Sequence, residues 1–546
     1  MKIKLLFFLF FLVFMIQDLL AQPYDMISVS DPVLEDLRYL ALVSGRPFLS
    51  FTPPLSPHEI EQFLDSLDNT NLPLPAQEAY QRARKRLTPE ANITFARKNF
   101  QFLLNIDSTI EIKTRLNTDI TWYPQYPDIP AFLTFPFRLS FVNIFQLYFE
   151  PGINVNSQYY NNTEYFGINL PYDFSYFDKT FPLKAYLAAG GSWWNVQLGR
   201  DRIFWGTGQT GSLSFADNSK FFEFFRFSAF TDIFKYSLMV NQMPLRVTEY
   251  LFSDQELLAS FPYNFMHTTQ RHFYLHRIDA TFFSRVTLSL MEGIMSANSG
   301  LELRFLNPFV IFHSFFAWED YEGWLIPRNG SMIGSFFSAE VNWNIVRNLA
   351  FHGQFVMNQF ALPSEIASGN QEPPNALGYL AGLHFTHSFK TWGSVFFVEF
   401  IYTDPYCYIL SSPFASFIQM IRIADNQEEY YYIGYPRDTM VLTVGTRFFQ
   451  DNALSIAGSF SWISSGEHNK DGITWDWNND QDAFNEKTPS GIAENKLIAS
   501  FSVQWNVLSF LSLSGNITGI YSMNNKHNSG SNEAGLQARV SVNFRY

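Results

Sequence analysis

The chain has 546 residues, of which 18% are aromatic, yet its mean hydropathy is only −0.07, so its large apolar side chains are interspersed with polar ones. After the N-terminus no run of 18 apolar residues occurs, which excludes a helical membrane protein. The single cysteine, Cys407, excludes a disulfide framework, and the net charge of −13 makes nucleic acid a poor partner.

Residues 1–21 have the layout of a secretory signal peptide. Two lysines in the first four residues precede an apolar run from Leu5 to Ile16, and Ala21 supplies a small residue before a cleavage point at Gln22. The apolar run is too short to span a bilayer comfortably as a helix. We therefore predict an exported protein, with an uncleaved N-terminal anchor as the alternative.

Residues 22–95 are predicted to form a small helical element in the periplasm. Asp31-Pro32 precedes apolar residues at helical spacing, and Gly45 is expected to end that helix. The sequence Ser56-Pro57-His58-Glu59 is a capping box that begins a second helix. A third helix is expected from Ala76 to Leu87, and we interpret its basic residues as a solvated face rather than a binding patch.

From residue 96 to residue 546 apolar and polar side chains alternate. The C-terminal segment from Leu536 to Tyr546 has an apolar residue at every second position, with Gln537, Arg539 and Ser541 between them. Because successive side chains of a strand point to opposite faces, such a strand has one apolar and one polar face. The same alternation occurs in segments that begin at Leu349, Leu454, Leu497 and Leu511.

Three features favour a membrane barrel over a soluble β-sandwich. The strands are often about ten residues long, as a tilted membrane span requires. The chain ends on an aromatic residue, Tyr546, in an amphipathic strand, which resembles the recognition strand of proteins inserted by the bacterial outer-membrane assembly machinery. Aromatic residues also gather where strands are expected to end, as in an interfacial girdle: Trp122-Tyr123, Trp193-Trp194, Tyr430-Tyr431-Tyr432 and Trp505.

The predicted fold class is all-β, a transmembrane antiparallel β-barrel of the bacterial outer membrane that carries a small N-terminal periplasmic helical element. A bilayer offers no water to unpaired backbone groups, so the sheet must close on itself. At roughly 25 residues per strand with its share of turn and loop, residues 96–546 predict about 18 strands.

One central motif connects the sequence to a known family. The stretch from Gln197 to Gly208, QLGRDRIFWGTG, followed by Gly211-Ser212-Leu213-Ser214, resembles the central motif of the Wzi capsule-assembly outer-membrane proteins. The pattern from Asp31-Pro32 to Leu55-Ser56 and the segment ELRFLNPF at residues 302–309 resemble two further segments of that family.

The resemblance implies a lectin-like barrel that binds and anchors capsular or exopolysaccharide at the cell surface without catalysis. Sugar binding there would use extracellular loops that offer aromatic faces and polar groups. In the loop from Ser464 to Glu494 the candidates for glycan contact are Trp475, Trp477, Asn478 and Asp480, and a solvated loop with incidental aromatic residues is an equal alternative.

The motif residues Gly199, Arg200, Trp205, Gly206 and Gly208 are interpreted as structural rather than sugar-binding. An arginine on the lumen face of a barrel can pair with acidic residues inside it. Glycines permit bends and the close approach of other chain segments.

Two other function classes stay open. A diffusion porin is the main alternative, in which the polar strand faces line a water channel. The two functions differ in the lumen: an open lumen passes small solutes, whereas a plugged lumen conducts poorly. An outer-membrane enzyme is the third class, but we find no nucleophile, metal-ligand or phosphate-loop motif. We therefore expect no catalytic residues, no cofactor and no metal.

The expected partners are the surface polysaccharide, outer-membrane lipid and, through the strand ending at Tyr546, the barrel assembly machinery.

Overall fold

The structure of the full chain is a computed structural model. The structure describes residues 25–545 apart from 89–90, 98, 118, 121–129, 143, 156–165, 171–172, 174–183, 218, 220, 244–269, 298–299, 313–332, 361–373, 411, 425–426, 452 and 470–485. The predicted signal peptide and Tyr546 lie outside the described residues.

The N-terminal helical element, residues 25–88, contains α2 (Val33–Ser44), α3 (Pro57–Asp65), η1 (Asn69–Asn71) and α4 (Leu74–Arg86). Gly45 ends α2 with a left-handed backbone (φ 71°), as the sequence predicts. The capping box of α3 is also confirmed: the Ser56 hydroxyl accepts from the Glu59 amide, and the Glu59 carboxylate accepts from the Ser56 amide. None of the helices among the described residues is long and apolar enough to cross a membrane.

The basic side chains of α4 are not simply solvated, so that part of the sequence interpretation is wrong. Arg82 forms a double hydrogen bond with Asp36 on α2, at 2.6 and 3.1 Å. Arg86 contacts Asp31 at 2.6 Å and Asp25 at 3.0 Å. These ion pairs join α4 to α2 and to the segment before it.

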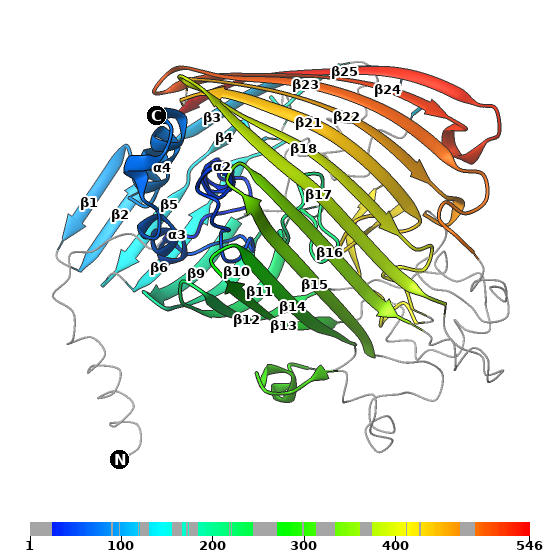
Figure 1. The fold of residues 1–546 in the computed structure, drawn as a ribbon, viewed down its shortest axis with the longest axis horizontal. Coiled ribbons are helices and arrows are strands. Elements are labelled where there is room, and N and C mark those ends of the chain that lie inside the picture. The colour runs from blue at the N-terminus through cyan, green and yellow to red at the C-terminus, as the bar shows by residue number, and fades with distance from the viewer. Residues whose placement is uncertain are drawn as a thin grey trace.

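Most of the rest of the described chain is antiparallel sheet (Figure 1). Its strands are β1 (Ile93–Arg97), β2 (Phe100–Leu104), β3 (Asp107–Leu116), β4 (Leu133–Thr134), β5 (Phe137–Phe141), β6 (Phe145–Glu150), β7 (Gly152–Ile153), β8 (Phe166–Ile168), β9 (Lys184–Gly191), β10 (Trp194–Asp201), β11 (Phe222–Phe230), β12 (Phe234–Gln242), β13 (Arg271–Phe282), β14 (Val286–Ala297), β15 (Ile333–Val346), β16 (Leu349–Gln359), β17 (Ala376–Phe389), β18 (Trp392–Thr403), β19 (Ile418–Ala424), β20 (Gln427–Tyr432), β21 (Thr439–Gln450), β22 (Leu454–Ser465), β23 (Glu494–Leu508), β24 (Leu511–Met523) and β25 (Asn532–Arg545).

The main sheet closes into a barrel because its last strand pairs with one of its first. β25 pairs antiparallel with β3 from Leu536↔Leu116 to Arg545↔Asp107. In the 23-stranded sheet of the described residues, β2 with β3, β4 with β5 and β6 with β7 each continue one another, while β1 and β8 are short additions beside β2 and β3. This leaves a ring of about 18 strands, an even number of the kind that bacterial barrels favour.

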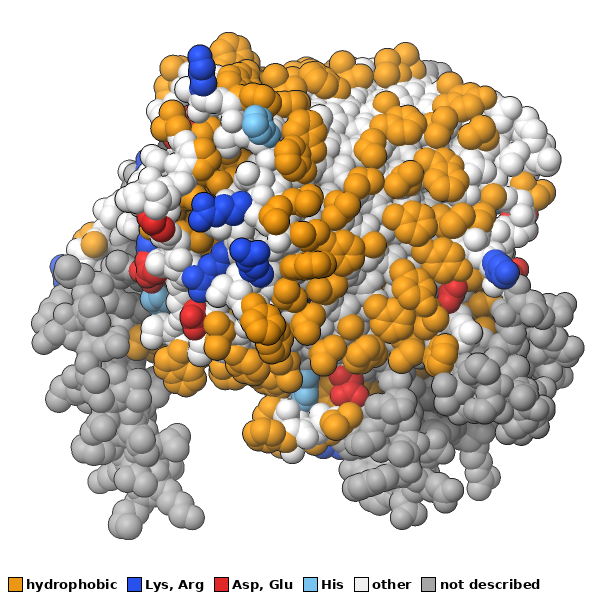
Figure 2. Space-filling view, in the orientation of Figure 1, with side chains coloured by type: hydrophobic (Ala, Val, Ile, Leu, Met, Phe, Trp, Pro, Cys, Tyr) orange, Lys and Arg blue, Asp and Glu red, His pale blue; other side chains and the backbone are white. Residues whose placement is uncertain are grey.

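The outer face of the barrel is apolar. On β23, β24 and β25 the outward side chains include Phe501, Trp505, Ile517, Leu536 and Val540, all about half exposed. Figure 2 shows hydrophobic side chains spread over the slanting strands, with charged side chains gathered toward the two ends. Such a continuous apolar surface is stable against lipid and not against water. The predicted alternation is therefore confirmed.

The two ends of the barrel differ. At one end the strands are joined by short turns, at residues 192–193, 283–285, 347–348, 390–391 and 509–510, and the helical element and the end of β25 lie there (Figure 1). At the other end the connections are long, as between β10 and β11 or between β18 and β21. The helices thus lie at the end with the short turns, which in outer-membrane barrels is typically the periplasmic end.

One expected girdle position is wrong. Tyr430, Tyr431 and Tyr432 were expected at the end of a barrel strand, but they belong to β20, which pairs only with β19 in a separate two-stranded sheet. The two strands β19 and β20 form a small hairpin within the connection between β18 and β21. Trp193 and Trp505 are exposed on the barrel, as a girdle requires.

Candidate functional site in the barrel lumen

The connection between β10 and β11, residues 202–221, enters the lumen and is called the motif loop here. Ile203, Trp205, Leu213 and Phe215 are fully buried in it. They form one hydrophobic cluster with wall residues such as Phe273 of β13. The Trp205 amide donates to the Phe215 carbonyl at 3.0 Å, which holds the loop as a narrow turn. Half of the central motif is therefore a packed insertion into the barrel.

Backbone hydrogen bonds join the motif loop to the N-terminal helical element. The Phe204 amide donates to the Pro53 carbonyl at 3.3 Å, and the Gly206 amide donates to the Phe51 carbonyl at 3.0 Å. Gly206 has a φ of 145°, and a Cβ there would lie 2.7 Å from the Ser212 hydroxyl oxygen. A side chain at this position would therefore disturb the junction between loop and helices.

The tip of the motif loop is held by Glu399 of β18. The Glu399 carboxylate accepts from the amides of Gln209 and Thr210, at 2.9 and 3.0 Å, and pairs with His352 Nε2 at 2.9 Å. Gly208 has no room for a side chain, because a Cβ would lie 2.1 Å from the Gly211 carbonyl oxygen.

Gly199 and Arg200 lie at the end of β10 rather than in the lumen. Gly199 has a φ of 139°, and a Cβ would meet the Ala185 carbonyl oxygen of the neighbouring strand at 2.4 Å. Arg200 follows it, and the expectation that its side chain faces the lumen is wrong. Asp201 is buried inside and accepts from the Ser28 hydroxyl at 3.1 Å, so alternation turns Arg200 outward. There Arg200 Nε donates to Glu223 of β11 at 2.6 Å.

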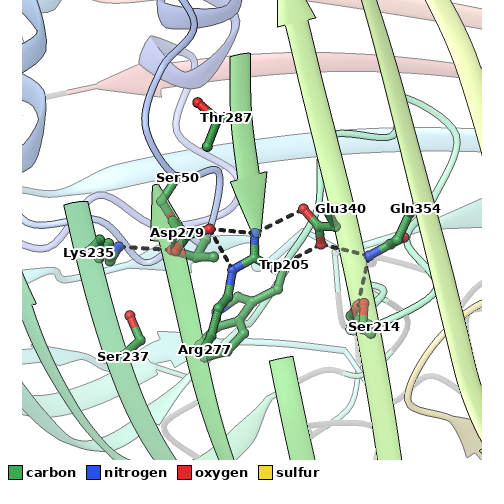
Figure 3. Close-up of polar contacts among 12 residues, drawn as sticks. Ser50, Trp205, Ser214, Lys235, Ser237, Arg277, Asp279, Thr287, Glu340 and Gln354 are labelled. Atoms are coloured by element: carbon green, nitrogen blue, oxygen red, sulfur yellow. Dashed lines mark hydrogen bonds and ion pairs between the residues drawn. The ribbon is translucent and has the colours of Figure 1, made fainter. Parts of the chain in front are cut away.

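A buried polar network crosses the lumen beside Trp205 (Figure 3). Arg277 of β13 donates to both carboxylate oxygens of Glu340, at 2.8 and 2.9 Å, and to Asp279 at 2.9 Å. Gln354 donates to Glu340 at 2.8 Å and to the Ser214 hydroxyl at 2.7 Å. Figure 3 shows how Arg277 sits between the two carboxylates, with Trp205 against it.

This network fixes three parts of the chain to one another. Ser214 belongs to the motif loop, and Ser50, whose hydroxyl donates to Asp279 at 2.9 Å, belongs to the helical element. The other partners come from β13, β15 and β16 of the wall. Because its charges are buried, each of them needs its partner, and loss of one group leaves another uncompensated.

Two further ion pairs anchor the helical element inside the barrel. Lys235 of β12 pairs with Glu59 of α3. Asp25 accepts from Arg86 at 3.0 Å and from Arg138 of β5 at 3.2 Å. Burial would raise the pKa of the Asp25 carboxyl, but the positive charges of Arg138, Arg86 and Lys184 outweigh it and lower the pKa to about 2.

The connection between β18 and β21, residues 404–438, forms a second insertion into the lumen. Cys407, Tyr408 and Phe417 are fully buried in the same cluster as Trp205. The Tyr408 hydroxyl donates to the Leu213 carbonyl at 2.9 Å, and Arg271 of β13 donates to the Ser416 carbonyl at 2.8 Å. Burial raises the pKa of the Cys407 thiol, so it stays protonated and unreactive.

The two insertions leave one side of the lumen open as a polar corridor with a volume of about 1150 Å³. Its wall is formed by lumen-facing residues of β21 to β25 and β3, and its other side by the start of α2 and by the two insertions. Serine and amide side chains dominate the wall, including Ser455, Ser459, Ser500, Ser502, Gln504, Ser514, Asn516 and Ser541.

Access to the corridor differs between its ends. Near the long loops its wall residues Ser465, Glu494 and Lys496 are buried, whereas toward the short turns Ser502 is partly exposed and Gln504 is exposed. The described wall of the corridor is therefore more exposed toward the end that holds the helices than toward the long-loop end.

The predicted glycan loop connects β22 and β23 at the long-loop end of the barrel. Trp475, Trp477, Asn478 and Asp480 themselves lie outside the described residues, so they stay a prediction. Sequence reasoning missed Glu399, Gln354 and the 404–438 insertion. The alternation of polar and apolar residues indicates which side chains of a strand face the lumen. It does not show which loop those side chains will contact.

No protein-family model matches the chain, and no curated protein matches its sequence. Among solved structures it is similar to Wzi of Escherichia coli, described as an outer-membrane protein involved in group 1 capsule assembly and as a carbohydrate-binding β-barrel. That match covers 96% of this chain and 99% of Wzi, with 13% identity and a TM-score of 0.57.

Two Pseudomonas aeruginosa proteins are more distant in structure. OprD matches over 82% of this chain and 95% of its own, with 9% identity and a TM-score of 0.39. OccD3 matches over 81% and 91%, with 8% identity and the same TM-score. The likeness to Wzi concerns the fold. Together with the closed ring of strands and the apolar outer face, it identifies this chain as a β-barrel of the outer membrane.

Proposed function

We propose that this barrel is a Wzi-like protein that binds capsular or exopolysaccharide and anchors it at the cell surface without performing chemistry. The observation that carries the proposal is the likeness in fold to a carbohydrate-binding barrel over nearly the whole of both chains. The sequence resemblance in the central motif adds to it, because that motif builds the insertion that joins the wall to the helices.

The filled part of the lumen supports an anchoring role over transport. The motif loop and the 404–438 insertion pack a hydrophobic cluster across the barrel, and buried ion pairs hold them in place. A rigid interior suits a platform for surface loops, because loops on a rigid scaffold bind with less loss of conformational entropy. The glycan contacts proposed for this platform are Trp475, Trp477, Asn478 and Asp480.

A diffusion porin is the second candidate, and the polar corridor favours it. The corridor has the volume and lining for small hydrophilic solutes. The burial of its wall residues Ser465, Glu494 and Lys496 toward the long-loop end argues against free passage. Planar-bilayer conductance separates the two functions: an anchoring protein gives small or no channel steps, and a porin gives regular open-channel currents.

Two partners are proposed at the membrane. Outer-membrane lipid covers the apolar face, and the barrel assembly machinery is proposed to recognise β25 with its terminal Tyr546. We also propose that export uses residues 1–21 as a cleaved signal peptide.

A deletion strain compared with its complemented strain tests the function. Cell-attached and released polysaccharide are measured separately, together with their total. The proposal expects the deletion to move polysaccharide into the medium while total synthesis is unchanged. Unchanged attachment in the deletion strain would contradict it. Complementation with Trp475→Ala/Trp477→Ala tests the loop, and Trp193→Ala, at a periplasmic turn, is the matched control.

A further inference from the structure

A short segment outside the barrel wall carries strongly exposed apolar side chains. Residues 300–312 follow β14 and contain the short helix η5 (Leu303–Leu306); they are called the outer flap here. Figure 1 shows the flap as a short green coil outside the sheet, below β13 and β14. Its sequence includes ELRFLNPF, one of the segments that resemble the Wzi family. Because the flap lies outside the sheet, it takes no part in filling the lumen.

The flap packs against the face of the wall that points away from the lumen. Arg277 of β13 belongs to the buried lumen network, so alternation turns His276 and Ile278 outward, and Ile278 is half exposed there. Phe305 and Phe312 of the flap are fully buried on this outer face. They form one cluster with outward residues of four neighbouring strands: Val240, Tyr274, Ile294 and Ile333.

Hydrogen bonds also hold the flap to the wall. In each of three contacts a backbone group of the flap meets an outward side chain of β13 or β14: the Phe312 amide donates to the Glu292 carboxylate at 2.8 Å, the Glu302 amide donates to the Tyr274 hydroxyl at 2.9 Å, and His276 Nε2 lies 3.2 Å from the Phe305 carbonyl oxygen. Polar side chains on a lipid-facing wall are costly unless they are bonded. The flap therefore covers a polar part of the outer wall.

The side of the flap that faces away from the wall is apolar. Leu303, Phe309 and Ile311 are 75%, 92% and 66% exposed. The two charged residues of the flap, Glu302 and Arg304, form an ion pair with each other. Large apolar side chains gathered in this way are unfavourable in water and mark a surface that another apolar phase covers.

This apolar side continues the lipid-facing surface of the barrel. Ile278 of β13 and Leu288 and Leu290 of β14 are about half exposed on the outer face. The next outward positions toward the long loops are His276 and Glu292, where the flap begins to cover the wall. Figure 2 shows hydrophobic side chains on the flap directly below those of the slanting strands. Lipid that contacts the wall therefore meets the flap at its long-loop edge.

We propose that the outer flap is a membrane-inserted element, whose apolar side enters the lipid beside the wall at the long-loop end. Its partners are lipid acyl chains. The hydrogen bonds to β13 and β14 hold the flap against the barrel, and Leu303, Phe309 and Ile311 add to the area that lipid covers. The inference goes beyond the proposed function, because it concerns how the barrel is seated in the bilayer and applies equally to a porin.

Spin-label accessibility tests the proposal in the full-length protein in phospholipid nanodiscs. A nitroxide at Phe309→Cys is exposed to oxygen, which concentrates in lipid, or to a neutral nickel chelate, which stays in water; Cys407 is fully buried and stays unlabelled. Val540→Cys on the outer face gives the lipid reference, and Asp232→Cys in an exposed turn gives the water reference. The expected ratio of oxygen to chelate collisions matches Val540→Cys. A ratio like that of Asp232→Cys would overturn the proposal.

A second copy of the chain seated on the flap gives a third, distinct result. It would lower collisions of the Phe309→Cys label with both reagents. It would also broaden the spectrum, because the labels of the two copies would be close enough to couple. This outcome would replace lipid by a protein partner and would likewise overturn the proposal.

A charge on the apolar side tests what drives insertion. With the label at Leu303→Cys, Phe309→Asp is expected to shift the ratio toward the nickel chelate, because a carboxylate is costly in lipid. Phe309→Leu is the matched control and is expected to keep the lipid-like ratio. Phe309 is 92% exposed, so neither change removes a buried contact, and heat-modified mobility on gels verifies the folded barrel. An unchanged ratio in Phe309→Asp would contradict insertion of this side.

Discussion

Lys235 on β12 and Glu59 on α3 form an ion pair inside the barrel, although 176 residues separate them in the chain. Both side chains are nearly inaccessible, at 1% and 6% exposure. Lys235 also donates to the Thr52 hydroxyl at 2.9 Å, just before α3. The pair therefore fixes the helical element against the barrel wall. Removing one of its charges tests how much this contact stabilises the protein.

Glu59→Gln is expected to destabilise the protein by about 3–5 kcal/mol, because it leaves the buried Lys235 ammonium without its counter-charge. The measurement is guanidinium unfolding of the detergent-solubilised barrel. The control is Glu61→Gln on the same helix, whose carboxylate is partly exposed and pairs with His58. Equal unfolding midpoints for the two variants would show that the ion pair does not anchor the helices.

Gly206→Ala is expected to destabilise the motif loop by roughly 1–3 kcal/mol, because a residue with a Cβ must hold a strained φ and move Ser212. Protease sensitivity of residues 202–221 would rise with it. Gly519→Ala on β24 is the control, since a Cβ there meets nothing within 4 Å. If both variants resist protease equally, the close approach of Ser212 to residue 206 does not affect the stability of the motif loop.

Much of the fold was predictable because its causes are local. The alternation in β23 to β25 sets one face toward lipid, and the capping box at Ser56 and Glu59 begins α3 without help from the barrel. The number of strands could be predicted from the chain length, because a closed barrel uses the whole segment for strands and their connections. These features depend on a residue and its near neighbours in sequence.

The site was less predictable because its contacts are distant in sequence. Arg200 was placed in the lumen, but a strand face depends on register, and Asp201 takes the inward position. Glu399 holds the tip of a loop 190 residues earlier in the chain, a distance that alternation alone does not span. The sequence of β19 and β20 predicts strands, but it does not show that these strands form a separate hairpin and are not part of the barrel wall.

The helical element is expected to lose stability in acid through Asp25. Its folded-state pKa of about 2 lies below the unfolded value of about 4, so its contribution is present above pH 4 and is lost as pH falls toward 2. The loss is roughly 2 kcal/mol by this linkage. Unfolding midpoints between pH 5 and pH 2 measure it. Asp25→Asn should flatten this part of the profile, and an unchanged slope in that variant would assign the acid sensitivity elsewhere.

Access to the corridor is expected only from the periplasmic end. In Ser502→Cys a membrane-impermeant maleimide should label the new thiol after the outer membrane is permeabilised and not in intact cells. Cys407 is fully buried and should stay silent. Ser522→Cys, at a fully buried position of β24, should stay unlabelled in both conditions. Labelling of Ser502→Cys in intact cells would mean that the long-loop end is open.

The central claim, that the barrel holds polysaccharide at the surface, is tested most directly by binding of the purified protein to polysaccharide from its own host. Proteoliposomes with the long-loop end outward are titrated with that polysaccharide, and the same preparation is examined for conductance. Saturable binding, lost when the loop between β22 and β23 is replaced by a short Gly-Ser link, with no regular channel currents, is the predicted result. No binding together with steady open-channel currents would contradict the anchoring function and favour a porin.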